Sequence, residues 1–248
     1  MKRFLRFMTA IALCFCVVFS VACKPEEEGS RFLKENIIED AYDNYYEIFV
    51  YSFYDSNGDG IGDLDGVASK LEYVRDMGYT GIWLMPIHPS PSYHKYDVTD
   101  YYSVYAKYGT LEDFEELIEK AHSLGIKVIL DLVVNHTSDL HPWFLESVKA
   151  KLRGEENEYL DFYNYSEEMK SGYTKFGSTY YESRFVSSMP DLNLDSANVR
   201  AEISSIMKFW LDKGADGFRL DACTSFYTGD GTKSVEFAKW LKEEAVKH

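Results

Sequence analysis

The stretch IKVILDLVV, residues 126–134, is almost entirely apolar and β-branched, with only Lys127 and Asp131 as charged residues. A short run of this composition predicts a central parallel strand that is covered on both faces, since a strand with one wet face would alternate polar and apolar residues. Gly125 precedes the run and ends a predicted helix over 111–124, for which Thr110 is a candidate N-cap.

The same order of strand, loop and helix occurs on both sides of this stretch. Four βα units with short loops predict an α/β fold with a parallel sheet, about half of a (β/α)8 TIM barrel. A doubly wound open sheet is the competing fold, but no glycine-rich phosphate turn follows the first strand. The segment 137–193 is long, aromatic and without a clean period, as expected of an insertion after the third strand. The other predicted strands are 46–53, 81–86 and 217–221, and the other helices 64–77, 197–211 and 234–246.

The composition excludes some classes of partner. The 248 residues carry a net charge of −15, which would repel a nucleic acid backbone. Twenty Tyr and sixteen Phe suit a neutral ring-shaped ligand such as a sugar, although most of these rings must form the core.

The first residues predict export. Lys2, Arg3 and Arg6 precede an apolar run over 7–21 that is too short for a comfortable membrane span, so 1–22 is predicted to be a signal peptide. Small residues before Cys23 resemble a bacterial lipobox, in which Cys23 would be lipidated and 23–43 would form a tether. The expected location is the bacterial membrane or cell surface, with the lipid as the only membrane contact; plain cleavage and secretion is the alternative. Only Cys223 remains in the body, so no internal disulfide is expected.

Polar residues follow the predicted strands where a parallel barrel places its catalytic groups. The third strand leads into Asn135 and His136, and the fourth ends in Arg219 and Asp221. Arg219 and Asp221 are two residues apart and share one face of the strand. An arginine keeps a buried carboxylate ionised, and such a carboxylate can attack an anomeric carbon. The alternative is a structural ion pair.

The loop after the first strand has oxygen donors at alternating positions with glycines between them. It resembles a calcium loop, which predicts a structural Ca²⁺ site. An EF-hand would require Glu where Gly66 stands, and the alternative to a metal site is an acidic turn. The predicted ligands are Asp55, Asn57, Asp59, the carbonyl of Ile61, and Asp63.

Several of these motifs together resemble glycoside hydrolase family 13, the α-amylase family. The resemblance is colinear from about Tyr45 to the end of the chain. It implies a (β/α)8 barrel, with 44–136 as its first part, 137–193 as the inserted domain B and 194–248 as its second part. The motifs that carry the resemblance are DLVVNH (131–136), GFRLDA (217–222), MPDLN (189–193), WLMP (83–86) and YHKYDVTDY (93–101).

The resemblance implies a role for each matching residue. Asp221 would be the nucleophile, oriented by Arg219; His136 would hydrogen-bond the reacting sugar; Tyr96 would stack on that sugar, with help from His94. Lys95 stands where glycine is common, so the local loop is expected to differ. Asp131 and Asp97 are expected to be structural. The resemblance also implies that the loop after the first strand binds either Ca²⁺ or Mg²⁺, as it does in many relatives. A second calcium site is not expected, because Ser225 stands where such sites have a histidine.

The implied function is that of a retaining glycoside hydrolase, a monomer that acts on α-1,4-glucans such as starch and maltodextrin. The general acid would follow a fifth strand, beyond His248, so we expect a fragment that is inactive alone. The alternatives are a non-catalytic glycan-binding surface lipoprotein on a barrel remnant and a barrel ectodomain that serves a transporter. Trp143, Trp210, Trp240 and Cys223 are expected in the core or at the barrel wall.

Overall fold

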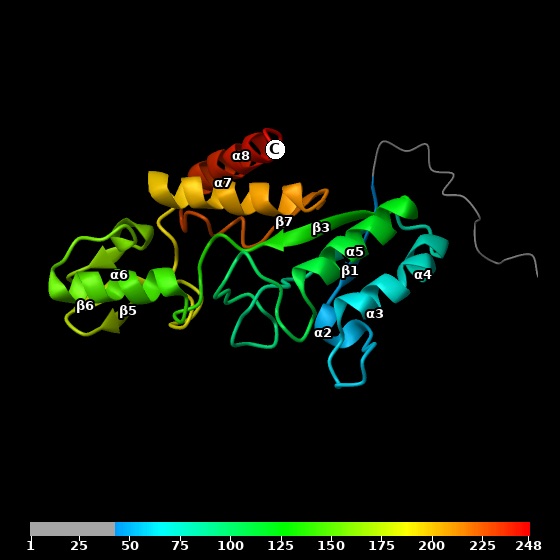
Figure 1. Ribbon diagram of the computed structural model, residues 1–248. Coiled ribbons are helices and arrows are strands. Elements are labelled where there is room, and N and C mark those ends of the chain that lie inside the picture. The colour runs from blue at the N-terminus through cyan, green and yellow to red at the C-terminus, as the bar shows by residue number, and fades with distance from the viewer. Residues whose placement is uncertain (1–42) are drawn as a thin grey trace, which may run out of the picture. The chain divides into compact units, whose positions relative to one another are not determined.

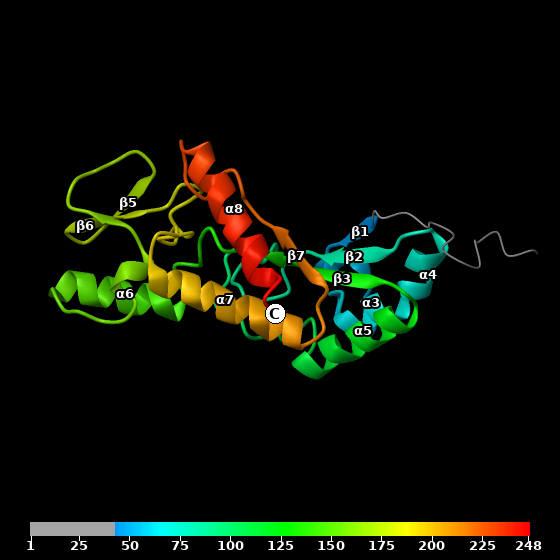
Figure 2. The same ribbon diagram turned by 90° about the horizontal axis from the view of Figure 1, so that it is seen from above.

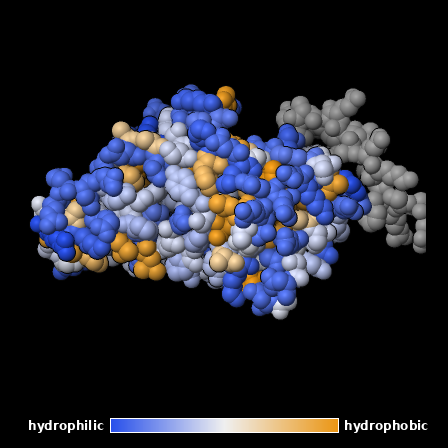
Figure 3. All heavy atoms as spheres, viewed as in Figure 1, coloured by the Kyte–Doolittle hydropathy of each residue, from blue (hydrophilic) through white to orange (hydrophobic). Residues whose placement is uncertain are grey.

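The computed structural model describes residues 43–248 (Figure 1), all within one compact unit of the chain. The predicted signal peptide, Cys23 and the tether up to residue 42 lie outside the described residues. No helix of the described part combines the length and the apolar character that crossing a bilayer requires. Figure 3 shows a face that is mostly hydrophilic, with hydrophobic residues in small separate groups.

A parallel sheet of four strands confirms the predicted fold class. The strands are β1 (Tyr45–Ile48), β2 (Gly81–Leu84), β3 (Lys127–Leu132) and β7 (Gly217–Leu220), in the order β1-β2-β3-β7. Each strand pairs with the next one along the parallel sheet, so the described strands show no reversal of the kind that a doubly wound sheet requires. Asp131 is in register with Arg219 across β3 and β7, which places the two polar motifs side by side.

The helices differ in detail from the predicted ranges. The predicted first strand ends at Ile48, and Val50–Phe53 forms the short helix α2. The predicted helix over 64–77 is divided at Lys70 into α3 (Leu64–Ser69) and α4 (Leu71–Asp76), because the backbone of Lys70 leaves the helical region at φ −107° and ψ 2°. The remaining helices of the repeated units are α5 (Leu111–Ser123), α7 (Ala197–Asp212) and α8 (Gly231–Ala245).

Capping and burial explain where α5 and α7 form. Thr110 and Asp113 make a reciprocal capping box that satisfies free amides at the start of α5. The apolar side chains of α5 cover β3, while Figure 2 shows α5 beside α3 and below the strands. Trp210 of α7 is 1% exposed and donates its indole N–H to the carbonyl of Tyr101, which confirms its predicted core position.

The segment 137–193 is more regular than predicted. It contains α6 (Pro142–Arg153), the 3₁₀ turn η1 (Leu160–Phe162) and an antiparallel sheet of β4 (Tyr165–Ser166), β6 (Thr179–Glu182) and β5 (Tyr173–Phe176). The sequence prediction missed α6 although its boundary signals are present. The imidazole of His141 accepts a hydrogen bond from the amide of Trp143, Pro142 opens the helix, and Gly154 ends it in a left-handed conformation at φ 69°.

Candidate active site

Four predicted site residues line one cavity at the carboxyl ends of the strands. Tyr96 and His94 come from the loop after β2, His136 from the end of β3, and Asp221 from the end of β7. The segment 137–193 adds a wall that the sequence did not predict: Phe185 lies in a stretch without a recognisable period, and Met189 is the first residue of the MPDLN motif. The full lining is His94, Tyr96, His136, Phe185, Met189, Asp221, Ala222, Thr224 and Ser225.

Arg219 lies between two carboxylates. Its Nη1 donates to Oδ1 of Asp221 at 2.8 Å and to the two oxygens of Asp131 at 3.0 and 3.1 Å. The side chain of Asp131 is fully buried, whereas that of Asp221 keeps 16% of its surface exposed towards the cavity. The guanidinium therefore stabilises negative charge on both sides, and only Asp221 is open to a ligand.

Asp131 also organises the aromatic side of the cavity. Its Oδ2 accepts hydrogen bonds from the hydroxyl of Tyr96 at 3.0 Å and from the indole N–H of Trp83 at 3.3 Å. The guanidinium of Arg219 lies over the Trp83 ring, 4.6 Å from its centroid. Burial raises the pKa of Asp131 to about 6 against the opposing effect of Arg219, and burial likewise raises the pKa of Tyr96, with Asp131 as the next cause. Asp131 thus orients Tyr96 and Arg219 through hydrogen bonds without lining the cavity itself, in keeping with its predicted structural role.

His136 presents a free nitrogen in the buried part of the cavity. Its Nε2 has no hydrogen-bond partner among the described residues, and the side chain amide of Asn135 lies 3.4 Å from its Nδ1. Burial lowers the pKa of His136, so the neutral imidazole is favoured at pH 7. Since a buried polar nitrogen without a partner is costly, His136 is suited to a hydroxyl-bearing ligand.

Lys95 is a buried lysine in the loop after β2 that carries His94 and Tyr96. It is 2% exposed and adopts a left-handed backbone conformation at φ 67°. Its ammonium donates to the carbonyls of Ser92 at 2.6 Å and Ser90 at 3.3 Å, and lies 3.7 Å from the centre of the Tyr105 ring. The lysine thus adopts the backbone conformation that glycine favours, and its buried ammonium group ties the loop together through the two serine carbonyls.

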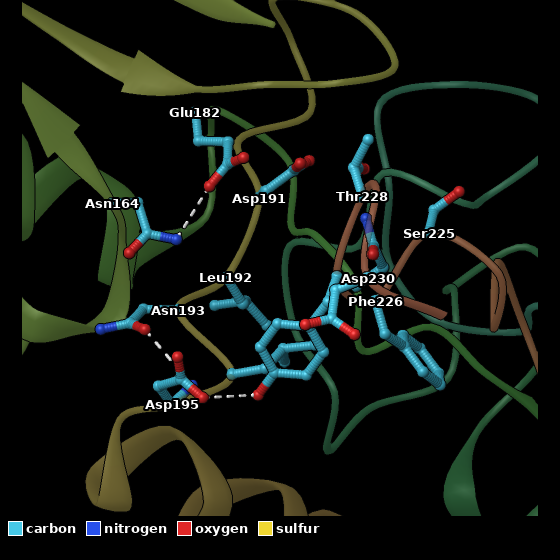
Figure 4. Close-up of a pocket in the computed structure, with 13 residues that line it drawn as sticks. Asn164, Glu182, Asp191, Leu192, Asn193, Asp195, Ser225, Phe226, Thr228 and Asp230 are labelled. Atoms are coloured by element: carbon cyan, nitrogen blue, oxygen red, sulfur yellow. Dashed lines mark hydrogen bonds between the residues drawn. The ribbon is translucent and has the colours of Figure 1, made fainter. Parts of the chain in front are cut away.

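A second, more polar cavity adjoins the first and was not predicted. Ser225 lines both cavities, and Asp191 of the MPDLN motif lies at the wall of the second (Figure 4). Figure 4 also shows the side chain amide of Asn164 bonded to Glu182, at 2.9 Å. Burial raises the pKa of Asp191 to about 7, with a hydrogen bond from the backbone amide of Arg184 as an opposing cause.

The predicted metal loop is closed by hydrogen bonds of its own acidic side chains. Asp55 accepts from the amides of Gly60 at 2.8 Å and Gly58 at 2.7 Å, which lowers its pKa, and Asp59 accepts from the amide of Ile61 at 2.9 Å. Asp63 is 4% exposed and caps α3 through the amide of Gly66. Within residues 43–248, no group of three or more His, Cys, Asp or Glu side chains is placed to hold a metal ion.

The structure corrects the prediction for Cys223. The residue is exposed rather than packed at the barrel wall, because the chain leaves β7 in a series of turns after Leu220. Trp143 and Trp240 are partly buried and pack against the core, as expected. Asp97 is 5% exposed and accepts a hydrogen bond from the hydroxyl of Ser90 at 2.5 Å, in keeping with a structural role.

Comparison with known proteins identifies the family to which these motifs belong. The profile described as "Alpha amylase, catalytic domain" matches residues 47–244. The chain is 50% identical over 203 residues to α-amylase 3 of Dictyoglomus thermophilum, a match that covers 80% of this chain and 39% of the relative. It is 44% identical over 192 residues to the oligo-1,6-glucosidase of Parageobacillus thermoglucosidasius, which covers 71% of this chain and 34% of the relative.

Solved structures agree with the sequence matches. Amy13B of Eubacterium rectale superposes with a TM-score of 0.81 at 48% identity, and the match covers 84% of this chain and 42% of that one. The α-amylase from H. orenii superposes with a TM-score of 0.74 at 42% identity, over 84% of this chain and 46% of that one. The chain therefore spans about two fifths of the length of the relatives that it matches.

Proposed function

Because the chain belongs to the α-amylase family of glycoside hydrolases, family 13, we propose that it acts on α-1,4-glucans such as starch and maltodextrin through Asp221 as nucleophile. The observation that supports this most is the shared cavity of Asp221, Tyr96 and His136, with Arg219 at 2.8 Å from the Asp221 carboxylate. The relatives include enzymes named for α-1,6 bonds and for trehalose 6-phosphate, so the bond preference is the part of this proposal that most needs a test.

The proposed reaction is a double displacement. The ionised carboxylate of Asp221 attacks the anomeric carbon and forms a glycosyl ester as the bond to the leaving oxygen breaks, and water then releases the sugar. Arg219 donates a hydrogen bond to this carboxylate and thereby orients it towards the cavity. Tyr96 offers its ring to the sugar face, and the free Nε2 of His136 offers a hydrogen bond to a sugar hydroxyl. A second carboxyl group must protonate the leaving oxygen, as the family resemblance implies.

The loop from Asp55 to Asp63 is proposed to hold a structural Ca²⁺, with Mg²⁺ as the alternative ion. The donors have the chemistry that a hard cation prefers, because they are oxygens at alternating positions of one loop. Since no three acidic side chains of the described residues are grouped closely enough to hold a metal ion, binding would require the loop carboxylates to turn towards the ion. Asp55, Asn57, Asp59, the Ile61 carbonyl and Asp63 would hold the ion, and its positive charge would offset the repulsion between the three carboxylates.

The proposed setting is outside the cytoplasm. The basic start, the apolar run and Cys23 support a lipoprotein at the bacterial membrane or cell surface, with secretion as the alternative. The protein is proposed to act as a monomer.

Substitution of the proposed nucleophile tests the function. Asp221→Asn removes the negative charge needed for attack. In a longer protein that also supplies the second carboxyl group, starch hydrolysis should therefore fall by at least about a thousandfold, while the dissociation constant for maltooligosaccharides changes by less than about fivefold. Asp212→Asn, at the exposed end of α7, is the matched control. Unchanged turnover in the Asp221 variant would refute the assignment of the nucleophile.

A further inference from the structure

The loop between α2 and α3 projects from the body of the described part (Figure 1) and contains the only asparagine of the chain that precedes a glycine, Asn57. Attack of the following amide nitrogen on the side-chain carbonyl carbon of an asparagine closes a succinimide ring. A side chain on the following residue hinders this attack, whereas glycine leaves the nitrogen accessible and the backbone free to rotate. Asn57 and Gly58 are both exposed, and a Cβ atom at Gly58 would meet no atom within 4 Å apart from its chain neighbours.

Hydrogen bonds within the loop polarise both reacting groups. The amide of Asp59 donates to Oδ1 of Asn57 at 2.9 Å, so a donor already faces the oxygen on which negative charge develops during the attack. The amide of Gly58 supplies the attacking nitrogen and donates to Oδ1 of Asp55 at 2.7 Å. A hydrogen bond to an anionic acceptor increases the electron density on the donor nitrogen. The folded loop therefore favours the attack at both of its partners.

A second asparagine provides a comparison within the chain. Asn157 is also exposed, and its Oδ1 accepts a hydrogen bond from the amide of Tyr159 at 3.1 Å. Its carbonyl oxygen is thus held in the same way as that of Asn57, by the amide of the residue two positions further on. Its attacking nitrogen would belong to Glu158, which carries a long side chain. The two asparagines share exposure and this hydrogen bond, and they differ in the residue that supplies the nitrogen.

We propose that Asn57 is a site of spontaneous deamidation. The nitrogen of Gly58 loses its proton to the solvent and bonds to the side-chain carbonyl carbon of Asn57. The bond from this carbon to Nδ2 breaks, and the amide leaves as ammonia after taking a proton from water. Water then opens the succinimide at either of its carbonyl groups, which yields aspartate or isoaspartate. This inference is independent of the proposed glycosidase function.

The products would weaken the start of α3. Nδ2 of Asn57 donates to Oδ2 of Asp63 at 3.1 Å, and a carboxylate at position 57 would instead repel this oxygen. The same oxygen of Asp63 accepts from the amide of Ser56 at 3.0 Å, and its other oxygen caps α3 through the amide of Gly66. Isoaspartate also lengthens the backbone directly after position 57. Deamidation should therefore lower the stability of the loop and of the helix that it leads into.

Mass spectrometry of peptides, with fragmentation to locate the changed residue, tests the proposal. The folded chain is incubated in slightly alkaline buffer with EDTA until Asn57 has reacted in a parallel sample unfolded in urea, which sets the time scale. We expect Asn57 of the folded chain to lose its amide at least about tenfold faster than Asn157, because Gly58 has no side chain. Asn57→Gln should show no mass change at this position, since glutamine closes the corresponding ring more slowly.

Two results would overturn the proposal. One is an Asn57 that keeps its amide in the folded chain while it reacts in urea, and the other is an Asn57 that reacts no faster than Asn157. The aspartate product is reproduced by Asn57→Asp, whose Tm in EDTA should lie below that of the wild type because of the contact with Asp63. Equal Tm values would overturn the predicted effect on the start of α3.

Discussion

At the scale of single residues, the buried carboxylate of Asp131 joins the two functional parts of the site. It accepts hydrogen bonds from Arg219, which contacts the proposed nucleophile, and from Tyr96, the proposed sugar platform. One side chain therefore sets the position of both groups relative to Asp221. Because the carboxylate is buried, losing either partner would leave a poorly compensated charge.

Lys95 allows a direct test of how the sugar-binding loop is held. Lys95→Met removes the donor to the carbonyls of Ser90 and Ser92 and keeps a side chain at positive φ, so the free energy of unfolding should fall by about 1–3 kcal/mol. Lys95→Gly also loses the ammonium group, but glycine adopts positive φ without steric strain. Its free energy of unfolding should therefore be about 1 kcal/mol higher than that of Lys95→Met.

Urea unfolding measures both changes. Lys70→Met is the control and should lose less stability. The ammonium group of Lys70 also lies over an aromatic ring, 3.8 Å from the centre of Tyr54, but the backbone of Lys70 has a negative φ. A Lys95→Met protein as stable as the wild type would contradict the proposed support of the loop.

Asp191 should make stability depend on pH. Burial raises its pKa to about 7 from 3.8, so the folded protein binds this proton more tightly than the unfolded chain does. The stabilising contribution is therefore complete below about pH 4 and is lost as the pH rises through 7. We expect the Tm of the wild type minus that of Asp191→Asn to decrease between pH 5 and pH 8, measured by calorimetry with a chelator present. A difference independent of pH would show that Asp191 does not titrate in this range.

At the scale of elements, the chemistry is carried by the loops that follow the strands, and their glycines permit close packing. A Cβ atom at Gly62 would lie 2.0 Å from the carbonyl oxygen of Val50, and one at Gly66 would lie 2.0 Å from that of Tyr54. Gly62 of the proposed calcium loop therefore lies directly against α2, where its amide donates to the carbonyl of Tyr51 at 2.8 Å, and Gly66 of α3 lies directly against Tyr54. The close approach at both places depends on residues without side chains.

Calcium should stabilise this loop and hence the protein. A ligand at a hundred times its dissociation constant adds about 2.7 kcal/mol, so the Tm should be several degrees higher in CaCl₂ than in EDTA. Asp59→Asn should reduce the difference, and Asp65→Asn, an exposed residue of α3, should not. Titration with MgCl₂ in the same assay compares the two ions, and equal Tm values in CaCl₂ and EDTA would exclude the site.

At the scale of the whole molecule, the prediction of export depends on residues outside the described part. Cys23→Ser should abolish labelling by radioactive palmitate and move the protein out of the bacterial membrane fraction, because the lipid is the proposed anchor. Cys223→Ser is the matched control, since Cys223 is an exposed thiol in the body of the protein. Wild-type protein that is found unlabelled in the medium would support the alternative of plain secretion.

Much of the fold and part of the site could be predicted from the order of elements. The strands β2, β3 and β7 follow from short apolar runs, and α5 and α7 from helical periodicity with caps. The helix α6 was missed although it buries Phe144, Ser147 and Val148 at helical spacing, because the segment 137–193 that surrounds it shows no clean period as a whole. The break at Lys70 could not be predicted, since the apolar period continues across it.

The sequence by itself determined the family, the parallel sheet and the identity of the motif residues, because these depend on local composition and on the order of motifs along the chain. Only the tertiary structure decided that Asp131 supports both Arg219 and Tyr96, that Phe185 and Met189 enclose the cavity, and that Phe49 meets Tyr93. Each of these contacts joins elements far apart in the sequence. They arise when parallel strands bring their carboxyl ends together, a geometry that no local pattern encodes.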